Sequence, residues 1–160
     1  MLVSVVIPCY NHGLYLEETV ISVVNSKYDE LEIIIVDDGS TDNSKQVATL
    51  LCSKFSKVSY YFQANSGPSV ARNFGISQSS GEYILPLDAD DLISDNYIVE
   101  AVSKFNEDPD LKVVYAKAIK FGKVNKPWSL KKFSLYSLAM DNLIYVSAIF
   151  RKSDWERVNG

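Results

Sequence analysis

Short apolar runs alternate with helix-spaced apolar residues along most of the chain. The runs are rich in β-branched and aromatic side chains, which is typical of strands buried on both faces of a sheet. They occupy residues 2–7, 31–36, 58–62, 83–87 and 111–118. Between two of these runs, Leu16, Val20 and Val23 recur at helical spacing. Strands and helices that alternate in this way predict an α/β fold, with a mostly parallel sheet and helices on both faces.

Each predicted helix is expected to bury one stripe of its surface. The residues expected to face inward are Val47, Leu50 and Leu51 in the second helix, Val70, Phe74 and Ile76 in the third, and Ile98, Ala101, Val102 and Phe105 in the fourth. Pro68 suits the first position of the third helix, and Ser94 can cap the fourth.

The regular alternation ends after Gly122, where a basic and aromatic segment begins. This segment contains Lys126, Trp128, Lys131, Lys132 and Phe133. Segments of this kind can touch nucleic acid or a membrane surface. Because the run is short and the chain is acidic overall, an exposed loop is the preferred interpretation.

Three further elements are expected at the end of the sequence. They are a short helix at 134–142, a strand at 144–151 and a helical turn at 153–158. A helix that ends in glycine normally leads to a further segment, so the chain is expected to continue beyond Gly160.

An acidic cluster follows the strand at 83–87. Asp88, Asp90 and Asp91 cannot lie inside a sheet covered on both faces, because desolvating an unpaired carboxylate is very costly. They are therefore expected in a loop at the carboxyl end of the strand, which is the edge where open α/β sheets bind ligands. Carboxylate oxygens suit magnesium or manganese, which also takes phosphate oxygens. The alternative is an acidic turn that caps the next helix.

Other polar loops should meet this cluster. The loop with Tyr10 and Asn11 and the loop with Asp37 and Asp38 each follow an apolar run. In a parallel sheet, loops that follow strands lie at the same edge. The topology therefore predicts one site built from segments that are far apart in the sequence.

Composition narrows the class of protein. The 160 residues are 47% hydrophobic and 22% charged, which is ordinary for one globular domain. The net charge of −4 argues against a nucleic-acid partner. Cys9 and Cys52 lack a metal-binding spacing and are interpreted as buried, reduced thiols. His12 is the only histidine, which excludes a multi-histidine metal site, and it is interpreted as a loop residue because nothing orients it.

The sequence also bears on location. No apolar run approaches the roughly 20 residues of a membrane span. Leu2–Ile7 has no basic leader and is interpreted as a strand, not a signal peptide. A cytoplasmic location is expected, and attachment to the inner face of a membrane through further residues is left open.

Five segments in order carry a pattern of known motifs. They are Val3–Asn11, Ile34–Asp42, Asn65–Ile76, Gly81–Asp91 and Ser147–Gly160. Together they resemble the inverting glycosyltransferases of family 2, which have the GT-A nucleotide-sugar fold. The third is similar to the family's Gly-x-x-x-Ala-Arg-Asn-x-Gly helix, and the fourth to the strand that ends in its D-x-D motif. The resemblance implies a single GT-A domain over 1–160, truncated at the C-terminus, with 1–122 binding the nucleotide sugar and 123–160 beginning the acceptor side.

The resemblance also implies roles for individual residues. Asp38 would accept a hydrogen bond from the uracil or other base of the donor. The loop of Pro8, Tyr10 and Asn11 would line the base pocket. Asp88 would bind the ribose or sugar side, Asp90 would coordinate Mn2+ or Mg2+, and Arg72 would reach the diphosphate or the base. Purely structural roles stay open: Asp37 and Asp38 can shape a turn, Asp42 can cap a helix, and Arg72 can form a surface ion pair.

The implied reaction is a single displacement at the anomeric carbon of a UDP-sugar or related donor. An acceptor hydroxyl, on a carbohydrate or lipid-linked compound as in polysaccharide biosynthesis, attacks opposite the nucleotide and inverts the configuration. The carboxylate base of the family is expected beyond Gly160. Asp141 and Asp154 are acidic, but nothing marks either as this base. The chain is therefore expected to bind nucleotide and metal but to transfer sugar poorly.

Three alternative functions remain open at this stage. A nucleotidyltransferase would need a glycine-rich, basic loop after the first strand, whereas 9–14 contains only Gly13 and no lysine or arginine. A phospho-receiver domain would need acids after its first and third strands, where this chain has Pro8-Cys9 and Gln63-Ala64. A non-catalytic nucleotide-sugar-binding module fits the sequence, and turnover with a panel of acceptors would separate it from an enzyme.

Overall fold

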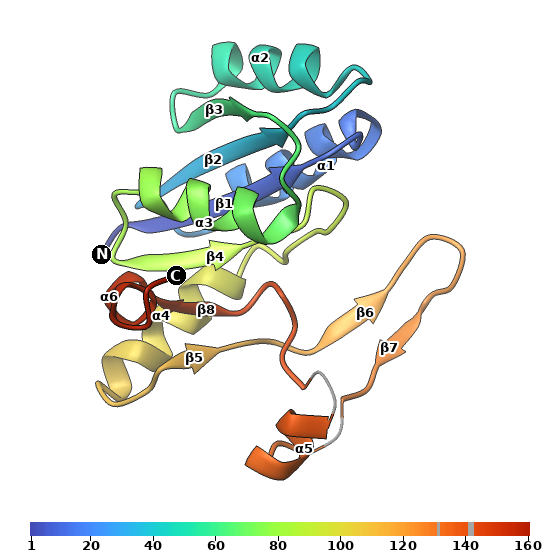
Figure 1. Ribbon diagram of the computed structural model, residues 1–160. Coiled ribbons are helices and arrows are strands. Elements are labelled where there is room, and N and C mark those ends of the chain that lie inside the picture. Colours follow the sequence, from blue (N-terminus) through green and yellow to red (C-terminus); the bar gives the residue numbers. More distant parts are fainter. Residues whose placement is uncertain (131, 141–142) are drawn as a thin grey trace.

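A six-stranded sheet lies at the centre of the computed structural model, which describes residues 1–130, 132–140 and 143–160 (Figure 1). In sheet order the strands are β3 (Val58–Gln63), β2 (Leu31–Asp38), β1 (Val3–Cys9), β4 (Tyr83–Pro86), β8 (Ile149–Arg151) and β5 (Val113–Val114). The first four pair in parallel, and β8 runs antiparallel to both of its neighbours. The prediction of a mostly parallel α/β sheet is confirmed.

Helices cover both faces of this sheet (Figure 1). Alternate strand residues such as Val5, Ile7 and Ile33 pack under α1 (Gly13–Val24), α2 (Ser44–Lys54) and α4 (Tyr97–Glu107). The residues between them, such as Val6 and Ile34, pack under α3 (Pro68–Gln78) and α6 (Lys152–Arg157). Because the strands are apolar on both faces, polar groups leave the sheet only at the ends of its strands.

Two helices bury a stripe that differs in part from the one predicted, although Leu51 and Ile76 are buried as expected. In α2, Ser44, Ala48 and Leu51 are buried, and Leu50 is 59% exposed, because positions four and three apart share a helix face. In α3 the buried residues are Ala71, Gly75 and Ile76, and Val70 is 50% exposed. A Cβ at Gly75 would lie 2.4 Å from Val6 Cγ1, so small residues let α3 approach the sheet closely.

The start of α4 also differs from the prediction. Asn96 occupies the N-cap position. Ser94 lies before it and accepts a hydrogen bond from Tyr97 N through its backbone carbonyl. The expected buried residues Ile98, Ala101, Val102 and Phe105 are confirmed.

The strands predicted at 111–118 and 144–151 are much shorter than expected. β5 contains only Val113 and Val114, which pair with two residues of β8. Ala118 belongs instead to β6 (Ala118–Lys120), which pairs with β7 (Lys126–Trp128) in a separate two-stranded sheet. The prediction of one long fifth strand is wrong, because only two of its residues pair with the three-residue strand β8 and Ala118 pairs with β7 instead.

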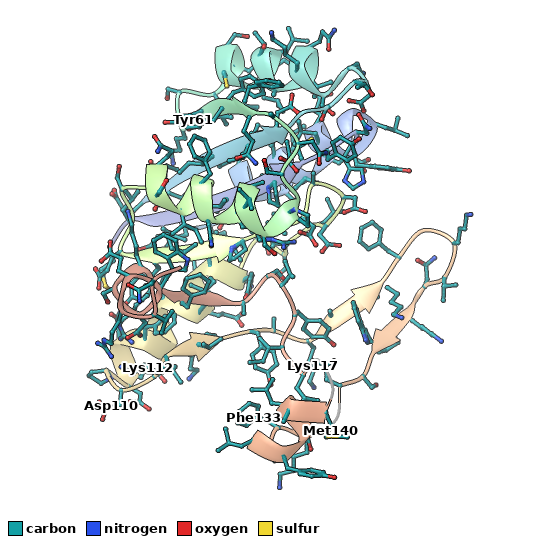
Figure 2. All side chains as sticks on the ribbon, in the orientation of Figure 1. Tyr61, Asp110, Lys112, Lys117, Phe133 and Met140 are labelled. Carbon is teal, nitrogen blue, oxygen red and sulfur yellow. The ribbon has the colours of Figure 1, made fainter. Side chains whose placement is uncertain are left out.

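The β6–β7 hairpin and α5 (Leu135–Met140) stand away from the main sheet (Figure 1). Phe133 and Met140 are exposed in this part of the molecule (Figure 2). The basic and aromatic segment is exposed as expected at Lys126, Trp128 and Phe133, although 126–128 is a strand and not a loop. Lys131 and the last two residues of the helix predicted at 134–142 lie outside the described residues.

β8, from the end of the sequence, lies between β4 and β5, so the end of the chain completes the same sheet as its beginning. Among the described residues, no helix is both long enough and apolar enough to cross a membrane.

Candidate functional site

The loops that follow β1 to β4 surround one cavity of about 570 Å3 at the carboxyl edge of the sheet. Ligand pockets typically have volumes of roughly 300–1,000 Å3. The cavity is lined by Pro8, Cys9, Tyr10, His12, Asp38, Asn65, Gly67, Pro68, Arg72, Asp88, Ala89 and Asp90. All of the sequence-predicted site residues except Asn11 are in this lining.

Asp38 is almost fully buried at the end of β2 and holds the loop that follows β3. Its Oδ1 accepts hydrogen bonds from Gln63 Nε2 at 2.7 Å and Ser66 N at 2.8 Å, and its Oδ2 accepts one from Gly67 N at 2.8 Å. A carboxylate offers about four acceptor positions, so one on Oδ2 remains for a ligand. Asp38 therefore shapes a turn and also presents an acceptor to the cavity.

Asp37, the neighbouring carboxylate, is buried but is not part of the cavity lining. Its Oδ1 accepts a hydrogen bond from Ser40 N at 2.8 Å, and its Oδ2 accepts one from the Tyr60 hydroxyl at 2.9 Å. Burial, together with this bond and the charge of Asp37, raises the pKa of Tyr60 far above its ordinary value. Of the two adjacent acids, Asp37 fixes the fold of the loop and Asp38 faces the cavity.

Asn11 joins the first loop to the second. Its backbone φ is 56°, and its Oδ1 accepts hydrogen bonds from Thr41 N at 2.8 Å and Asp42 N at 3.3 Å. Its backbone N donates to Ser40 Oγ at 3.0 Å. Contact between Asn11 and a nucleotide stays a prediction, because the side chain binds the neighbouring loop.

Asp42 connects the starts of two helices. Its Oδ2 accepts a hydrogen bond from Gly13 N at 3.0 Å, and its Oδ1 accepts bonds from Ser44 N at 2.9 Å and Ser44 Oγ at 2.5 Å. Desolvation tends to raise the pKa of Asp42, but these hydrogen bonds outweigh it and lower that pKa below its ordinary value. Asp42 therefore accepts a hydrogen bond from the first backbone N–H of both α1 and α2, although the N-cap residues are His12 and Asn43.

Arg72 and Asp88 form an ion pair across the cavity. Arg72 lies in the second turn of α3, and its Nη2 is 2.5 Å from Oδ1 of Asp88, which follows β4. Both side chains are partly buried, at 23% and 36% exposure. The Nε of Arg72 is buried and has no hydrogen-bond partner among the described residues. The guanidinium thus offsets one acid of the cluster and keeps an unused donor.

A residue of α1 holds the acidic loop of Asp88, Asp90 and Asp91 in place. The hydroxyl of Thr19, which is fully buried, donates to the carbonyl of Ala89 at 2.9 Å, and Asp91 N donates to the carbonyl of Asp88 at 3.0 Å. Partial desolvation raises the pKa of Asp91, and the nearby charges of Asp88 and Asp90 raise it further. The three carboxylates are therefore close enough to repel one another, and Arg72 is paired with only one of them.

These acids fit a divalent cation of the Mg2+ or Mn2+ type. In the described part of the chain, no group of three or more His, Cys, Asp or Glu side chains could enclose an ion by itself. Mg2+ commonly takes only one or two protein carboxylates and completes its shell with water and phosphate. Asp90 lines the cavity and, among the described residues, forms no ion pair with an arginine, whereas Asp88 does; coordination of a cation by Asp90 stays a prediction.

The sequence did not predict two of the residues that shape this site. His12 lies in the cavity lining, and its Nδ1 is 4.0 Å from Asp90 Oδ1, although nothing in the sequence oriented it. Thr19 supports the acidic loop. A signal for Thr19 was present, because it is a polar residue within the buried stripe of Leu16, Val20 and Val23. Cys9 is a buried thiol as predicted, whereas Cys52 is only partly buried.

The sequence matches one protein family over most of its length. The family model described as Glycosyl transferase family 2 matches residues 4–156. The chain is 40% identical over 114 residues to glycosyltransferase GlyG of Streptococcus pneumoniae serotype 4, a match that covers 71% of this chain and 38% of that protein. It is 44% identical over 88 residues to the uncharacterized glycosyltransferase YibD of Escherichia coli K12, covering 55% and 26%. The chain spans less than half the length of these relatives.

Solved structures resemble the whole chain. Residues 1–349 of S. aureus TarS in complex with UDP-GlcNAc match with a TM-score of 0.84 and 27% identity, over 99% of this chain and 48% of that one. The mannosyltransferase PcManGT from Pyrobaculum calidifontis, in complex with GDP-Man and Mn2+, matches with a TM-score of 0.77 and 20% identity, over 99% and 46%. At that identity the second match concerns the fold alone.

Proposed function

Because this chain belongs to glycosyl transferase family 2 and has the GT-A fold, we propose that it binds a UDP-sugar and takes part in moving the sugar to an acceptor hydroxyl. The observation that carries this proposal is that Asp38, Arg72 and Asp90 line the same cavity. Family membership favours a glycosyltransferase over the nucleotidyltransferase and phospho-receiver alternatives. The UDP-GlcNAc complex of TarS supports a uridine nucleotide as the donor.

Asp38 and Tyr10 are proposed to receive the base. The acceptor position that remains on Asp38 Oδ2 suits a ligand N–H, and the imide N–H of uracil is such a donor. Tyr10 is 49% exposed and lines the same cavity, so its ring can cover an aromatic base. A buried carboxylate that must accept a hydrogen bond discriminates against bases that lack a donor at that position.

Arg72 and the acidic loop are proposed to receive the diphosphate and ribose. Arg72 has further guanidinium N–H donors besides the one that Asp88 accepts, so it can donate to a phosphate oxygen without breaking that pair. Asp88 can accept from a ribose or sugar hydroxyl through the oxygen that Arg72 does not bind. Asp90 would hold the divalent cation, which supplies positive charge to the leaving diphosphate when bound.

In the proposed reaction the acceptor oxygen forms a bond to the anomeric carbon as the bond to the diphosphate breaks. The electron pair leaves with UDP, the acceptor proton goes to a base, and the configuration at the anomeric carbon inverts. We assign no base among the described residues. Asp154 lies on α6 in ion pairs with Lys112 and Arg157 and does not line the cavity, and Asp141 lies outside the described residues.

A turnover assay with UDP-GlcNAc tests this function. The measurement is UDP release in the presence of Mn2+ and a panel of sugar and lipid-linked acceptors, with proton NMR to give the anomeric configuration of the product. Release that needs an acceptor, with inversion, supports the proposal. Binding of UDP-GlcNAc without turnover for any acceptor supports a non-catalytic binding module, and a retained configuration contradicts the proposed displacement.

A further inference from the structure

We propose that His12 is a second protein ligand of the cation at Asp90 and that its imidazole makes the site prefer manganese to magnesium. This inference rests on the proposed function, which assigns the cation to Asp90. It adds a nitrogen ligand from the loop after β1 to a site so far built only from the loop after β4.

The distance between the two side chains permits shared coordination. His12 Nδ1 lies 4.0 Å from Asp90 Oδ1, and both residues line the same cavity. Two ligand atoms that are each about 2.1 Å from one ion can be at most about 4.2 Å apart. The observed separation is just below this limit, whereas adjacent ligands of an octahedral ion are about 3 Å apart, so shared coordination requires the two side chains to rotate toward each other.

The backbone of His12 is firmly held. Its carbonyl accepts hydrogen bonds from Tyr15 N and Leu16 N, both at 3.0 Å, at the start of α1. Its ring also packs edge-on against Tyr15, with the ring centroids 6.2 Å apart and an interplanar angle of 80°. The backbone that carries the imidazole is thus fixed at the start of α1, and Tyr15 contacts the ring, whereas the sequence alone showed nothing that would orient it.

The acidic loop carries more negative charge than its basic neighbours offset. Arg72 pairs with Asp88, and in the described part of the chain His12 is the only basic side chain with a nitrogen within 4.0 Å of an Asp90 carboxylate oxygen. Asp91 adds a further carboxylate to the same turn. A divalent ion between Asp90 and His12 would offset this negative charge and use the imidazole as a neutral ligand.

The type of ligand determines which ion is favoured. Mg2+ is a hard cation that binds oxygen and keeps most of its water, so an imidazole adds little to its affinity. Mn2+ also binds oxygen ligands well, but as a first-row transition metal it accepts an imidazole nitrogen more readily than Mg2+ does, although less readily than Zn2+ or Ni2+. A site with carboxylate, imidazole and phosphate ligands therefore favours Mn2+ over Mg2+. Without His12 the site would contain only oxygen ligands and would discriminate less between the two ions.

The sequence makes this inference directly testable, because His12 is the only histidine. In protein without an affinity tag, pulsed electron paramagnetic resonance of bound Mn2+ should show the nitrogen-14 modulation of an imidazole, and 15N labelling of histidine should change it. The substitution His12→Gln should remove the modulation and weaken Mn2+ binding by roughly tenfold or more. Mg2+ affinity, measured by competition, should change less, so the preference for Mn2+ should shrink.

Two further variants separate the possible outcomes. Leu14→Gln places the same side chain at an exposed position outside the cavity lining and should leave Mn2+ binding unchanged. Asp90→Asn should weaken Mn2+ binding strongly. If Asp90→Asn does so but the wild type shows no imidazole modulation, or His12→Gln binds Mn2+ as the wild type does, the role of His12 is refuted and the Asp90 site stands. Equal Mn2+ binding by the wild type and Asp90→Asn refutes both.

Discussion

Arg72 and Asp88 lie on different elements and meet across the cavity, with Arg72 Nη2 2.5 Å from Asp88 Oδ1. Ion pairs that are fully exposed contribute little to the stability of a protein. The pair of Arg72 and Asp88 is instead partly buried and lies in the cavity lining. The pair holds the guanidinium over the acidic loop, and the buried Nε has no partner among the described residues. This position within the cavity lining is consistent with the proposed role of Arg72 in binding the diphosphate.

Replacing Arg72 should weaken nucleotide binding more than it affects folding. In Arg72→Ala the diphosphate loses a charge-assisted donor and Asp88 loses its partner, so the Kd for UDP should rise roughly tenfold or more. Arg72→Lys should restore only part of the affinity, because an ammonium cannot bind Asp88 and a phosphate with a planar fork. Isothermal titration calorimetry with UDP measures both variants.

Arg157→Ala provides the matched control for Arg72→Ala. Arg157 also pairs with an aspartate, at 3.4 Å from Asp154, but its side chain is 72% exposed and lies outside the cavity lining. UDP affinity should not change in this variant. An equal loss in Arg72→Ala and Arg157→Ala would show that Arg72 acts only through net charge.

Asp38→Asn and Asp37→Asn should separate structure from ligand binding. Each acid accepts hydrogen bonds that hold a loop, so each variant should lower the free energy of unfolding by about 1–3 kcal/mol. Only Asp38 lines the cavity, so only Asp38→Asn should abolish UDP binding. Urea unfolding and UDP titration are the two measurements, and an equal loss of UDP affinity in both variants would contradict a direct role for Asp38.

Thr19→Val should loosen the acidic loop without touching any ligand. The substitution keeps the volume of the side chain but leaves the carbonyl of Ala89 without its buried donor, which should cost about 1 kcal/mol or more of stability. Thr49→Val, on the exposed face of α2, should change stability by less than about 0.5 kcal/mol. Mn2+ affinity should fall only in Thr19→Val, and unchanged affinity would show that the loop holds its shape without this bond.

Asp42 should make stability depend on acid pH. Its folded-state pKa is lowered, so the folded state binds fewer protons than the unfolded state just below the ordinary aspartate pKa. The stabilisation by Asp42 is therefore present above the unfolded-state pKa of about 3.9 and is lost as the pH falls through the folded-state value. Because Asp42 is exposed and solvent screens its charge, Asp42→Ala should cost only about 0.5–1 kcal/mol near neutral pH.

Urea unfolding of the wild type and Asp42→Ala at a series of pH values checks this dependence. The difference in stability should shrink as the pH falls below about 3.9. A difference that stays constant down to strongly acidic pH would mean that the ionised carboxylate of Asp42 contributes nothing beyond its shape.

The sequence predicted most of the sheet because its signals there are local. Each of β1 to β4 is an apolar run that ends at a polar loop, and the parallel order brings Tyr10, Asp38 and Asp88 to one edge. The strand at 111–118 was mispredicted because its local pattern favours a strand, whereas its length depends on the partner β8 from the end of the chain. Strand propensity alone does not contain that information.

The site shows the same division between local and distant signals. Asp90 and Arg72 lie in recognisable motifs, whereas the proximity of His12 to Asp90 became visible only in the folded chain. Leu50 and Val70 were misplaced for a related reason, because small residues in the same helices determine which face approaches the sheet. Contacts between a helix and the sheet determine which helix residues are buried, and the spacing of apolar residues along one helix is not enough to predict them.

The most direct test of the proposed donor site is calorimetric titration of UDP, with and without Mn2+, on the wild type and on Asp90→Ala. We predict that UDP binds the wild type more tightly when Mn2+ is present and that this increase disappears in Asp90→Ala. UDP affinity that is the same with and without Mn2+, and the same in both proteins, would contradict a metal-assisted nucleotide-sugar site at the carboxyl edge of the sheet.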